Sequence, residues 1–479
     1  MKHKIVAVIL GCVLILLMPL ALLVTGLALP PQFGQTYYGQ FANMYDALYQ
    51  TEGKKIVVVG NSAVAFGVDS ALVERELQGC GLDYKVRNFG LYGALGTKMT
   101  VDLSLDGIGE GDVVVFMPEL IPQSMSLYFS AEQAWRALDQ DKGMISALDS
   151  DNRAQLIGTF PKFVAEKYKY ALVGGAKGEG VYASSVFDER GDMKNYARTE
   201  NIMQGAYDPD STFDFETSLI KADFVSYIND YYAKIYGKGA KMYFYFAPIN
   251  ALSVTETGKN NFDGFVDALT EAFDFPLLGD PTDAVMQAEW FYDANVHLND
   301  AGMTTYSLTL VNALKTRMGS SVPNATQPPE MPALPENKLP DGEGDSSHAK
   351  YFLYETEGEG VRVVGLTEEG LEQTSLTLPW TIDGKAVVAM DKTTFRGNAL
   401  VQEITLQRNI KRIPDDSFDG CTALKKIHLK HTKPTQIGIS TDKLLSDTDG
   451  ACFYVDKDVL PSFVNNYSWS YYAAYLKGE

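Results

Sequence analysis

Cysteine and histidine are scarce in this chain, and acidic residues outnumber basic ones. The 479 residues include four cysteines and five histidines. The cysteines lie far apart, which excludes a disulfide framework and the clustered ligands of a structural metal site; they are Cys12, Cys80, Cys421 and Cys452. The formal charge of −20 argues against a nucleic-acid partner, because phosphate binding needs a basic surface. We therefore expect neither a metal site nor nucleic-acid binding.

Long apolar runs are also missing, except at the amino terminus. Residues 5–29 contain no charged side chain and follow Lys2 and Lys4. The run exceeds the apolar core of a secretory signal and is long enough for a spanning helix, which needs about 20 residues. The basic end should stay in the cytoplasm. We expect a single-pass transmembrane signal anchor over residues 1–29 in the cell membrane, with the bulk of the chain extracytoplasmic; cleavage near the small residues 26–28 is the alternative.

Residues 54–318 alternate between short apolar runs and helical patterns. The first run, residues 56–59, is β-branched throughout and is typical of a strand that is buried on both faces. Strands that alternate with helices form a parallel sheet, so the sequence predicts a doubly wound α/β domain. The predicted strands are 55–59, 84–89, 112–117 and 241–246, and the predicted helices are 71–77, 97–105, 261–273 and 303–317.

Other segments flank or interrupt this domain. Residues 30–53 are aromatic-rich and are predicted as a juxtamembrane segment with a short helix at 41–48. The long polar and aromatic stretch 124–238 is predicted as an insertion over the sheet. Residues 319–348 carry six prolines and no phenylalanine, tyrosine or tryptophan, so we expect an extended linker. Residues 349–479 are then a separate C-terminal domain.

The C-terminal domain contains an internal repeat with an offset of 23 residues. A period of about 20–29 residues with this apolar spacing is typical of leucine-rich repeats, in which each unit adds one short strand to a stack. We predict stacked strands at residues 404–406 and 427–429. The repeat resembles the BspA-type leucine-rich repeat of bacterial surface proteins over residues 370–477. The matching pairs are Val387/Ile410, Met390/Ile413, Phe395/Phe418, Gly397/Gly420, Val401/Leu424, Ile404/Ile427 and Leu406/Leu429.

One serine and one histidine stand out in the α/β domain. Ser62 follows the first strand after a glycine and an asparagine, at the sheet edge where open α/β proteins bind ligands. A serine nucleophile needs a base, and His297 is the one histidine of this domain. Asp293 precedes it by four residues, so on a helical turn its carboxylate would share a face with the imidazole. The candidate catalytic residues are therefore Ser62, His297 and Asp293.

The order of these groups resembles the SGNH (GDSL-like) hydrolase family. The family carries its serine in a Gly-Asp-Ser motif after strand one, and this chain has Gly60, Asn61 and Ser62 there. A second family motif, Asn-x-Gly-x-x-Gly, matches Asn88 to Gly93. The resemblance implies a three-layer, flavodoxin-like α/β/α domain without a cofactor. It also places Asn88 and Gly93 in the oxyanion and substrate-binding site, where Gly93 donates its backbone N–H to the oxyanion.

Two positions depart from the family pattern. The family supplies an asparagine after strand three as a second oxyanion donor, and this chain has Glu119 there. The family's last motif is Asp-x-x-His, whereas Asp293 lies one residue farther from His297, and Ala294 stands at the family's aspartate position. An ionised glutamate cannot donate a hydrogen bond. The second oxyanion donor and the orienting acid therefore stay open.

An anchored domain of this type resembles enzymes that acylate cell-wall polymers and exopolysaccharides together with a multi-spanning membrane O-acyltransferase. The resemblance implies that Ser62 accepts an acyl group and passes it to a polysaccharide hydroxyl, or to water in an esterase. Each residue also has an ordinary explanation: Ser62 as a turn or cap residue, His297 as a satisfied polar group, and Gly93 as part of a tight turn. The alternative is thus a non-catalytic surface binding or adhesion protein with a degenerate SGNH domain and leucine-rich repeats.

Overall fold

The computed structural model describes residues 17–209, 211–334, 344–357, 360–439, 443–466 and 469–479. The chain divides into two compact units. The described residues up to Pro332, apart from residues 200–211, form the N-terminal unit. Residues 200–211 belong with the described residues from Ala333 onward, and together they form the C-terminal unit.

A four-stranded parallel sheet is the centre of the N-terminal unit. Its strand order is β2-β1-β3-β4, and every neighbouring pair is parallel. The central strand β1 is buried along its whole length, as its unbroken apolar run predicts. The predicted combination of helices with a parallel sheet is confirmed. The strands are β1 (Lys55–Gly60), β2 (Lys85–Gly90), β3 (Val113–Met117) and β4 (Lys241–Phe244), and a separate two-stranded sheet pairs β5 (Ile249–Asn250) with β6 (Val285–Met286).

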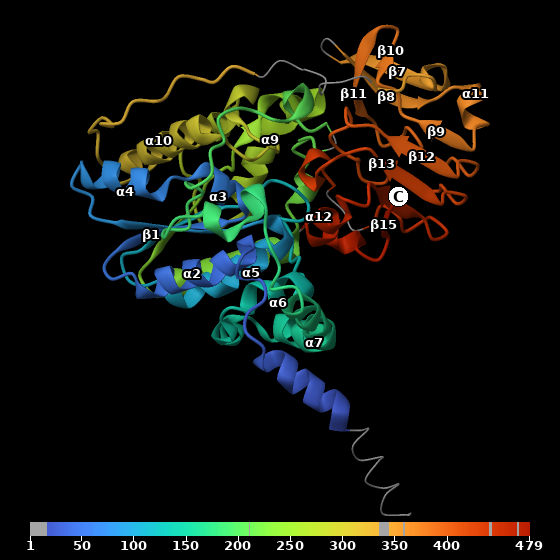
Figure 1. The fold of residues 1–479 in the computed structure, drawn as a ribbon. Coiled ribbons are helices and arrows are strands. Elements are labelled where there is room, and N and C mark those ends of the chain that lie inside the picture. Colours follow the sequence, from blue (N-terminus) through green and yellow to red (C-terminus); the bar gives the residue numbers. More distant parts are fainter. Residues whose placement is uncertain (1–16, 210, 335–343, 358–359, 440–442, 467–468) are drawn as a thin grey trace, which may run out of the picture. The chain divides into compact units, whose positions relative to one another are not determined.

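Helices cover both faces of the central sheet. Figure 1 shows α4 and α10 on one side of the sheet and α2 and α5 on the other. Between β3 and β4 the chain forms a long excursion with three helices, α6 to α8, in the region predicted as an insertion. The helices are α2 (Tyr37–Gln50), α3 (Ser62–Gly67), α4 (Ser70–Gln78), α5 (Thr97–Ser104), α6 (Ala131–Leu138), α7 (Ser150–Ala171), α8 (Ala222–Gly237), α9 (Glu256–Ala272) and α10 (Asp300–Arg317).

The predicted membrane anchor is only partly described. Residues 17–28 form a helix, and the preceding part of the predicted anchor, residues 1–16, lies outside the described residues. Within the described part of the chain, no helix is both long and apolar enough to cross a membrane.

The C-terminal unit has its own hydrophobic core and two sheets. In one sheet five short strands run parallel in the order β15-β14-β13-β12-β9. Ile404 of β12 pairs with Ile427 of β13, the register that the 23-residue offset predicts. The strands are β9 (Ser375–Thr377), β12 (Glu403–Leu406), β13 (Lys426–Leu429), β14 (Cys452–Val455) and β15 (Leu476–Gly478); the other sheet contains β7 (Phe352–Glu357), β8 (Gly360–Leu366), β10 (Thr381–Ile382) and β11 (Lys385–Met390), and the unit's helices are α11 (Glu368–Leu371) and α12 (Leu460–Asn465).

Candidate functional site

Ser62 lies where the central strand passes directly into a short helix. β1 ends at Gly60, Asn61 is the N-cap, and Ser62 is the first residue of α3. Two glycines permit this tight junction: a Cβ on Gly60 would lie 2.2 Å from Met117 O, and a Cβ on Gly90 would lie 2.7 Å from Asn61 O. Ser62 is 5% exposed. The junction therefore holds the serine hydroxyl at the carboxyl edge of the sheet, almost out of solvent.

The structure brings Ser62, His297 and Asp293 into one hydrogen-bonded chain. Ser62 Oγ lies 2.7 Å from His297 Nε2, and His297 Nδ1 lies 2.8 Å from Asp293 Oδ1. Because a carboxylate only accepts hydrogen bonds, Nδ1 carries the hydrogen of the second bond. The three side chains therefore have the geometry of a nucleophile, a base and an acid that orients the base.

The local structure around His297 differs from the expected helical turn. Phe291 and Leu298 pair as an antiparallel bridge, and His297 N–H donates to Ala294 O at 3.1 Å. Asp293 and His297 thus face each other across a tight turn that ends before α10. The prediction of a shared helical face is wrong, although the turn brings the two side chains together.

Aromatic side chains fix the plane of the imidazole. The Phe66 ring stacks on His297 with a centroid distance of 3.9 Å and an interplanar angle of 5°. The Tyr92 ring meets His297 edge-on at 6.3 Å. The guanidinium of Arg198 lies 5.2 Å from the Phe66 centroid and forms an ion pair with Asp300 at 3.1 Å. Sequence reasoning missed Phe66 and Arg198, although Phe66 follows Ser62 by four residues, a spacing that shares a helix face.

Glu119 is a direct partner of Ser62. Its Oε1 accepts from Ser62 Oγ at 2.6 Å and from the backbone N–H of Ala63 at 3.0 Å. Ser124 Oγ donates to the other oxygen, Oε2, at 3.4 Å. Glu119 is 3% exposed. The residue that departs from the family pattern therefore competes with His297 for the single hydrogen of Ser62.

The hydrogen bonds at Ser62 permit two arrangements of protons. If Ser62 donates to Glu119, then His297 must carry a hydrogen on Nε2 as well as on Nδ1, and the imidazole is charged. If Ser62 donates to His297, then Glu119 must carry a hydrogen to complete its own bond to Oγ. The two arrangements contain the same number of protons and differ by one proton passed through Ser62. In the second arrangement His297 is free to act as a base.

Gly93 lies beside the same cluster. It begins a 3-10 turn, Gly93–Leu95, after β2. A Cβ on Gly93 would lie 3.6 Å from Glu119 Oε2 and 3.8 Å from Asn61 Nδ2. Gly93, Glu119 and Asn61 therefore face one small region next to Ser62.

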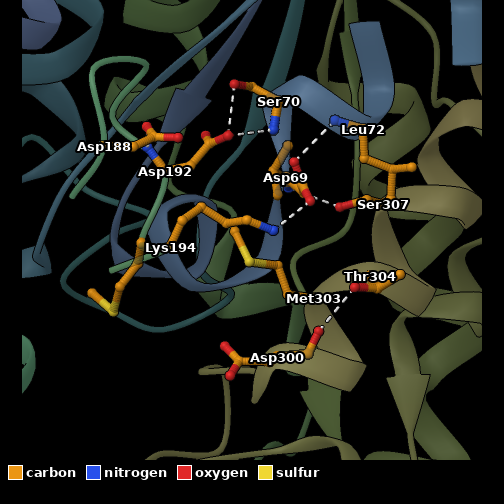
Figure 2. A network of polar contacts seen from close by, with 12 residues as sticks. Asp69, Ser70, Leu72, Asp188, Asp192, Lys194, Asp300, Met303, Thr304 and Ser307 are labelled. Atoms are coloured by element: carbon orange, nitrogen blue, oxygen red, sulfur yellow. Dashed lines mark hydrogen bonds and ion pairs between the residues drawn. The ribbon is translucent and has the colours of Figure 1, made fainter. Parts of the chain in front are cut away.

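Asn88 lies in a different cluster. Its Nδ2 donates to Val68 O at 2.8 Å and to Asp192 Oδ1 at 2.5 Å. The second carboxylate oxygen of Asp192 accepts from both the backbone N–H and the hydroxyl of Ser70, each at 2.8 Å (Figure 2). Asn88 therefore ties the end of β2 to the insertion, and the structure does not place it against Ser62.

The Asp192 cluster fastens the insertion to α4 and α10. Burial raises the pKa of Asp192 to about 7, and the charges of Asp188 and Asp69 add to this effect. Asp69 caps α4 by accepting from Leu72 N–H at 2.9 Å, and it pairs with Lys194 at 2.6 Å. The same residue's backbone N–H donates to Ser307 Oγ of α10 at 2.8 Å; Figure 2 shows these side chains converging.

Within the described ranges, no group of three or more histidine, cysteine, aspartate or glutamate side chains is arranged to hold a metal ion.

Comparisons with known proteins give weak similarities. No family model matches the chain. No curated protein matches it. Among solved structures, the leucine-rich repeat protein TpLRR of T. pallidum matches with 21% identity over 24% of this chain and 55% of its own, at a TM-score of 0.16. Protein YXIM from Bacillus subtilis matches with 11% identity over 57% of this chain and 58% of its own, at a TM-score of 0.26. The chain thus covers less than two thirds of either structure.

Proposed function

We propose that the N-terminal unit is a serine acyl-transfer enzyme of the SGNH type, with a doubly wound, flavodoxin-like domain. The observation that carries the proposal is the hydrogen-bonded chain from Ser62 through His297 to Asp293. It lies at the carboxyl edge of a parallel sheet, where α/β enzymes assemble their sites. The acyl groups are those of cell-wall or extracellular polysaccharides, and the enzyme is an O-acyltransferase or an esterase.

Acylation begins when His297 Nε2 takes the hydrogen of Ser62 as Oγ attacks the carbonyl carbon of an acyl ester. The carbonyl oxygen becomes an oxyanion, and the backbone N–H of Gly93 donates to it. When the tetrahedral intermediate collapses, the bond to the leaving alcohol breaks, and His297 returns the proton to that alcohol. Ser62 is left as an ester, and His297 is neutral again.

Deacylation repeats these steps with a new hydroxyl. His297 deprotonates a polysaccharide hydroxyl, or water in an esterase, which attacks the Ser62 ester. Collapse of the second intermediate releases Ser62 Oγ, which recovers its hydrogen from His297. Asp293 holds Nδ1–H throughout, so Nε2 keeps facing Ser62. Phe66 stacks on the imidazole and opposes its rotation.

The proposed setting is the outer side of the cell membrane. The uncharged run at residues 5–29 supports a membrane anchor. An anchored acyl-transfer domain suits a multi-spanning membrane O-acyltransferase as the partner that delivers the acyl group. The stacked strands of the C-terminal unit suit a surface that binds polysaccharide, since stacked repeats present extended binding faces.

A second candidate function is a non-catalytic surface binding or adhesion protein. The observation that favours it is the 2.6 Å hydrogen bond from Ser62 to Glu119, which draws the serine hydrogen away from His297. In that case the Ser62 cluster would be a structural remnant of an enzyme. The two candidates differ in whether Ser62 forms an ester.

The test is hydrolysis of an aryl acetate by the full chain and by its Ser62→Ala variant. The proposal predicts that kcat falls by at least roughly 10⁴-fold in the variant, because no other group takes the acyl chain. Ser104→Ala is the matched control, since Ser104 is equally buried on α5 and bonds to Tyr231 instead. Acetate release that is equal in wild type and Ser62→Ala would exclude the enzyme and favour the binding protein.

A further inference from the structure

The asparagine that precedes Ser62 uses its side chain in an unusual way for an N-cap. An N-cap asparagine ordinarily accepts a hydrogen bond from the second or third amide of its own helix. The Asn61 side chain makes no such bond to α3. The backbone N–H of Ala63, in the first turn of that helix, donates to Glu119 instead. The Asn61 side chain is therefore available for another role.

Thr97 holds the carbonyl end of this side chain. Thr97 Oγ1 donates to Asn61 Oδ1 at 2.8 Å and shares its hydrogen with Ser124 O at 2.7 Å. The amide nitrogen points the other way, toward Gly93. A Cβ on Gly93 would lie within 3.8 Å of both Asn61 Nδ2 and Glu119 Oε2. Next to the Glu119 carboxylate, an N–H donor is favoured over a carbonyl oxygen. This preference supports the orientation in which Asn61 Nδ2 faces Gly93 and Glu119.

The amide nitrogen has no partner of its own. Asn61 is 2% exposed, and among the residues that the structure describes no hydrogen bond joins its Nδ2 to another group. This nitrogen is not one of the fully buried atoms that lack a partner, so it keeps some contact with solvent although Asn61 as a whole is buried. A ligand oxygen next to Ser62 can therefore reach this donor.

We propose that Asn61 is a catalytic residue, whose Nδ2–H donates, together with the backbone N–H of Gly93, to the oxyanion formed at Ser62. The inference rests on the proposed acyl-transfer function. The Asn61 amide takes the place of the second oxyanion donor, which an ionised Glu119 cannot supply. This role explains why the chain has asparagine where the SGNH motif has aspartate.

The test compares Asn61→Asp and Asn61→Ala with wild type in aryl acetate hydrolysis by the full chain. Asn61→Asp keeps an oxygen for Thr97, so the fold is retained while the donor is lost. We expect kcat to fall by about 10²–10³-fold, the usual cost of one oxyanion donor, with KM little changed. Affinity for an arylboronic acid, which forms a tetrahedral adduct with the serine, should fall in parallel. If Asn61 had only a structural role, kcat would not fall selectively relative to KM, and the affinity for the boronic acid would not change.

Asn229→Asp is the matched control, because Asn229 on α8 donates to Ala272 O and lies outside the Ser62 cluster. It should keep the wild-type kcat. If Asn61→Asp keeps kcat within about threefold of wild type while Ser62→Ala loses it, the role of Asn61 is overturned and the acyl-transfer function stands. If Ser62→Ala also keeps full activity, both proposals fail.

Discussion

Ser62 has one hydrogen and two close acceptors, and this competition defines the chemistry of the site at the residue scale. Glu119 Oε1 lies 2.6 Å away on one side and His297 Nε2 lies 2.7 Å away on the other. A hydrogen bond to a carboxylate is roughly twice as strong as one between neutral groups. The hydrogen bond to Glu119 therefore competes with the transfer of the Ser62 hydrogen to His297.

Replacing Glu119 by glutamine should weaken this competing hydrogen bond. In Glu119→Gln the side-chain oxygen can still accept from Ala63 N–H, but the negative charge beside Ser62 and the oxyanion is gone. We expect kcat for aryl acetate to rise by up to about tenfold, the factor that corresponds to about 1.4 kcal/mol. Steady-state kinetics measure this effect.

Glu119→Ala is the companion variant, because it removes the acceptor of Ala63 N–H together with the charge. It should be less stable than Glu119→Gln by about 1–3 kcal/mol, the cost of an unsatisfied buried donor. A fall of kcat by more than tenfold in Glu119→Gln would contradict the competition described above and would make Glu119 an essential proton carrier.

Part of this residue-scale arrangement follows from the sequence alone. His297 is the one histidine of the α/β domain, so a serine–histidine pair in this domain had to join Ser62 to His297. Glu119 follows β3, which lies next to β1 in the sheet, and the carboxyl ends of neighbouring parallel strands meet. The direction of each side chain did not follow, because Thr97 reaches the cluster from α5 through packing that leaves no pattern in the sequence.

At the scale of elements, a short stretch of the insertion is clamped to the sheet domain at both ends. Asp192 bonds to Ser70 and Asn88 at one end, and Arg198 pairs with Asp300 at the start of α10 at the other. Arg198 also faces the Phe66 ring, which stacks on His297. The clamp therefore supports the orientation of the His297 imidazole from outside the strands.

The clamp should make stability depend on pH through Asp192. Its pKa is raised from 3.8 to about 7, so between these values the folded chain keeps a proton that the unfolded chain has released. The stabilising contribution is fully present below about pH 4, is lost as the pH rises toward 7, and stays lost above it. One pKa unit corresponds to about 1.4 kcal/mol, so the total loss is on the order of a few kcal/mol.

Asp192→Asn removes the titrating group and should flatten this dependence. Urea unfolding at pH 5 and pH 8 measures it: the wild type should lose more free energy of unfolding between the two values than the variant does. Asp188→Asn should remove part of the effect, because the Asp188 charge contributes to the raised pKa. Equal pH dependence in wild type and Asp192→Asn would contradict a raised pKa.

Some elements could be predicted from the sequence and others could not. The apolar run at residues 56–59 identifies β1, since a fully buried strand needs no alternation. Helix α3 was missed because all six of its residues are buried, and a helix without a polar face shows no periodicity. The turn at His297 was missed because the backbone of Asn250, which donates to Asn295 O at 2.9 Å, helps to hold it from outside.

At the scale of the whole molecule, the two units have different organisation. The N-terminal unit combines a parallel sheet with helices on both faces, which places Ser62 at a sheet edge. The C-terminal unit has a separate core of stacked apolar strands. Its 23-residue register could be read from the sequence, because each unit of a stack repeats the contacts of its neighbour. Residues 200–211, which belong to the C-terminal unit, carry no pattern that predicts this.

The central claim is that Ser62 becomes esterified during turnover. The most direct measurement is rapid acid quenching of the full chain with an aryl acetate, followed by mass spectrometry of its peptides. The account predicts an acetyl group on Ser62 in the wild type, more of it when Glu119 is glutamine, and none in the Ser62→Ala variant. Hydrolysis without any acetyl group on Ser62, or an acetyl group on another residue that accounts for turnover, would contradict it.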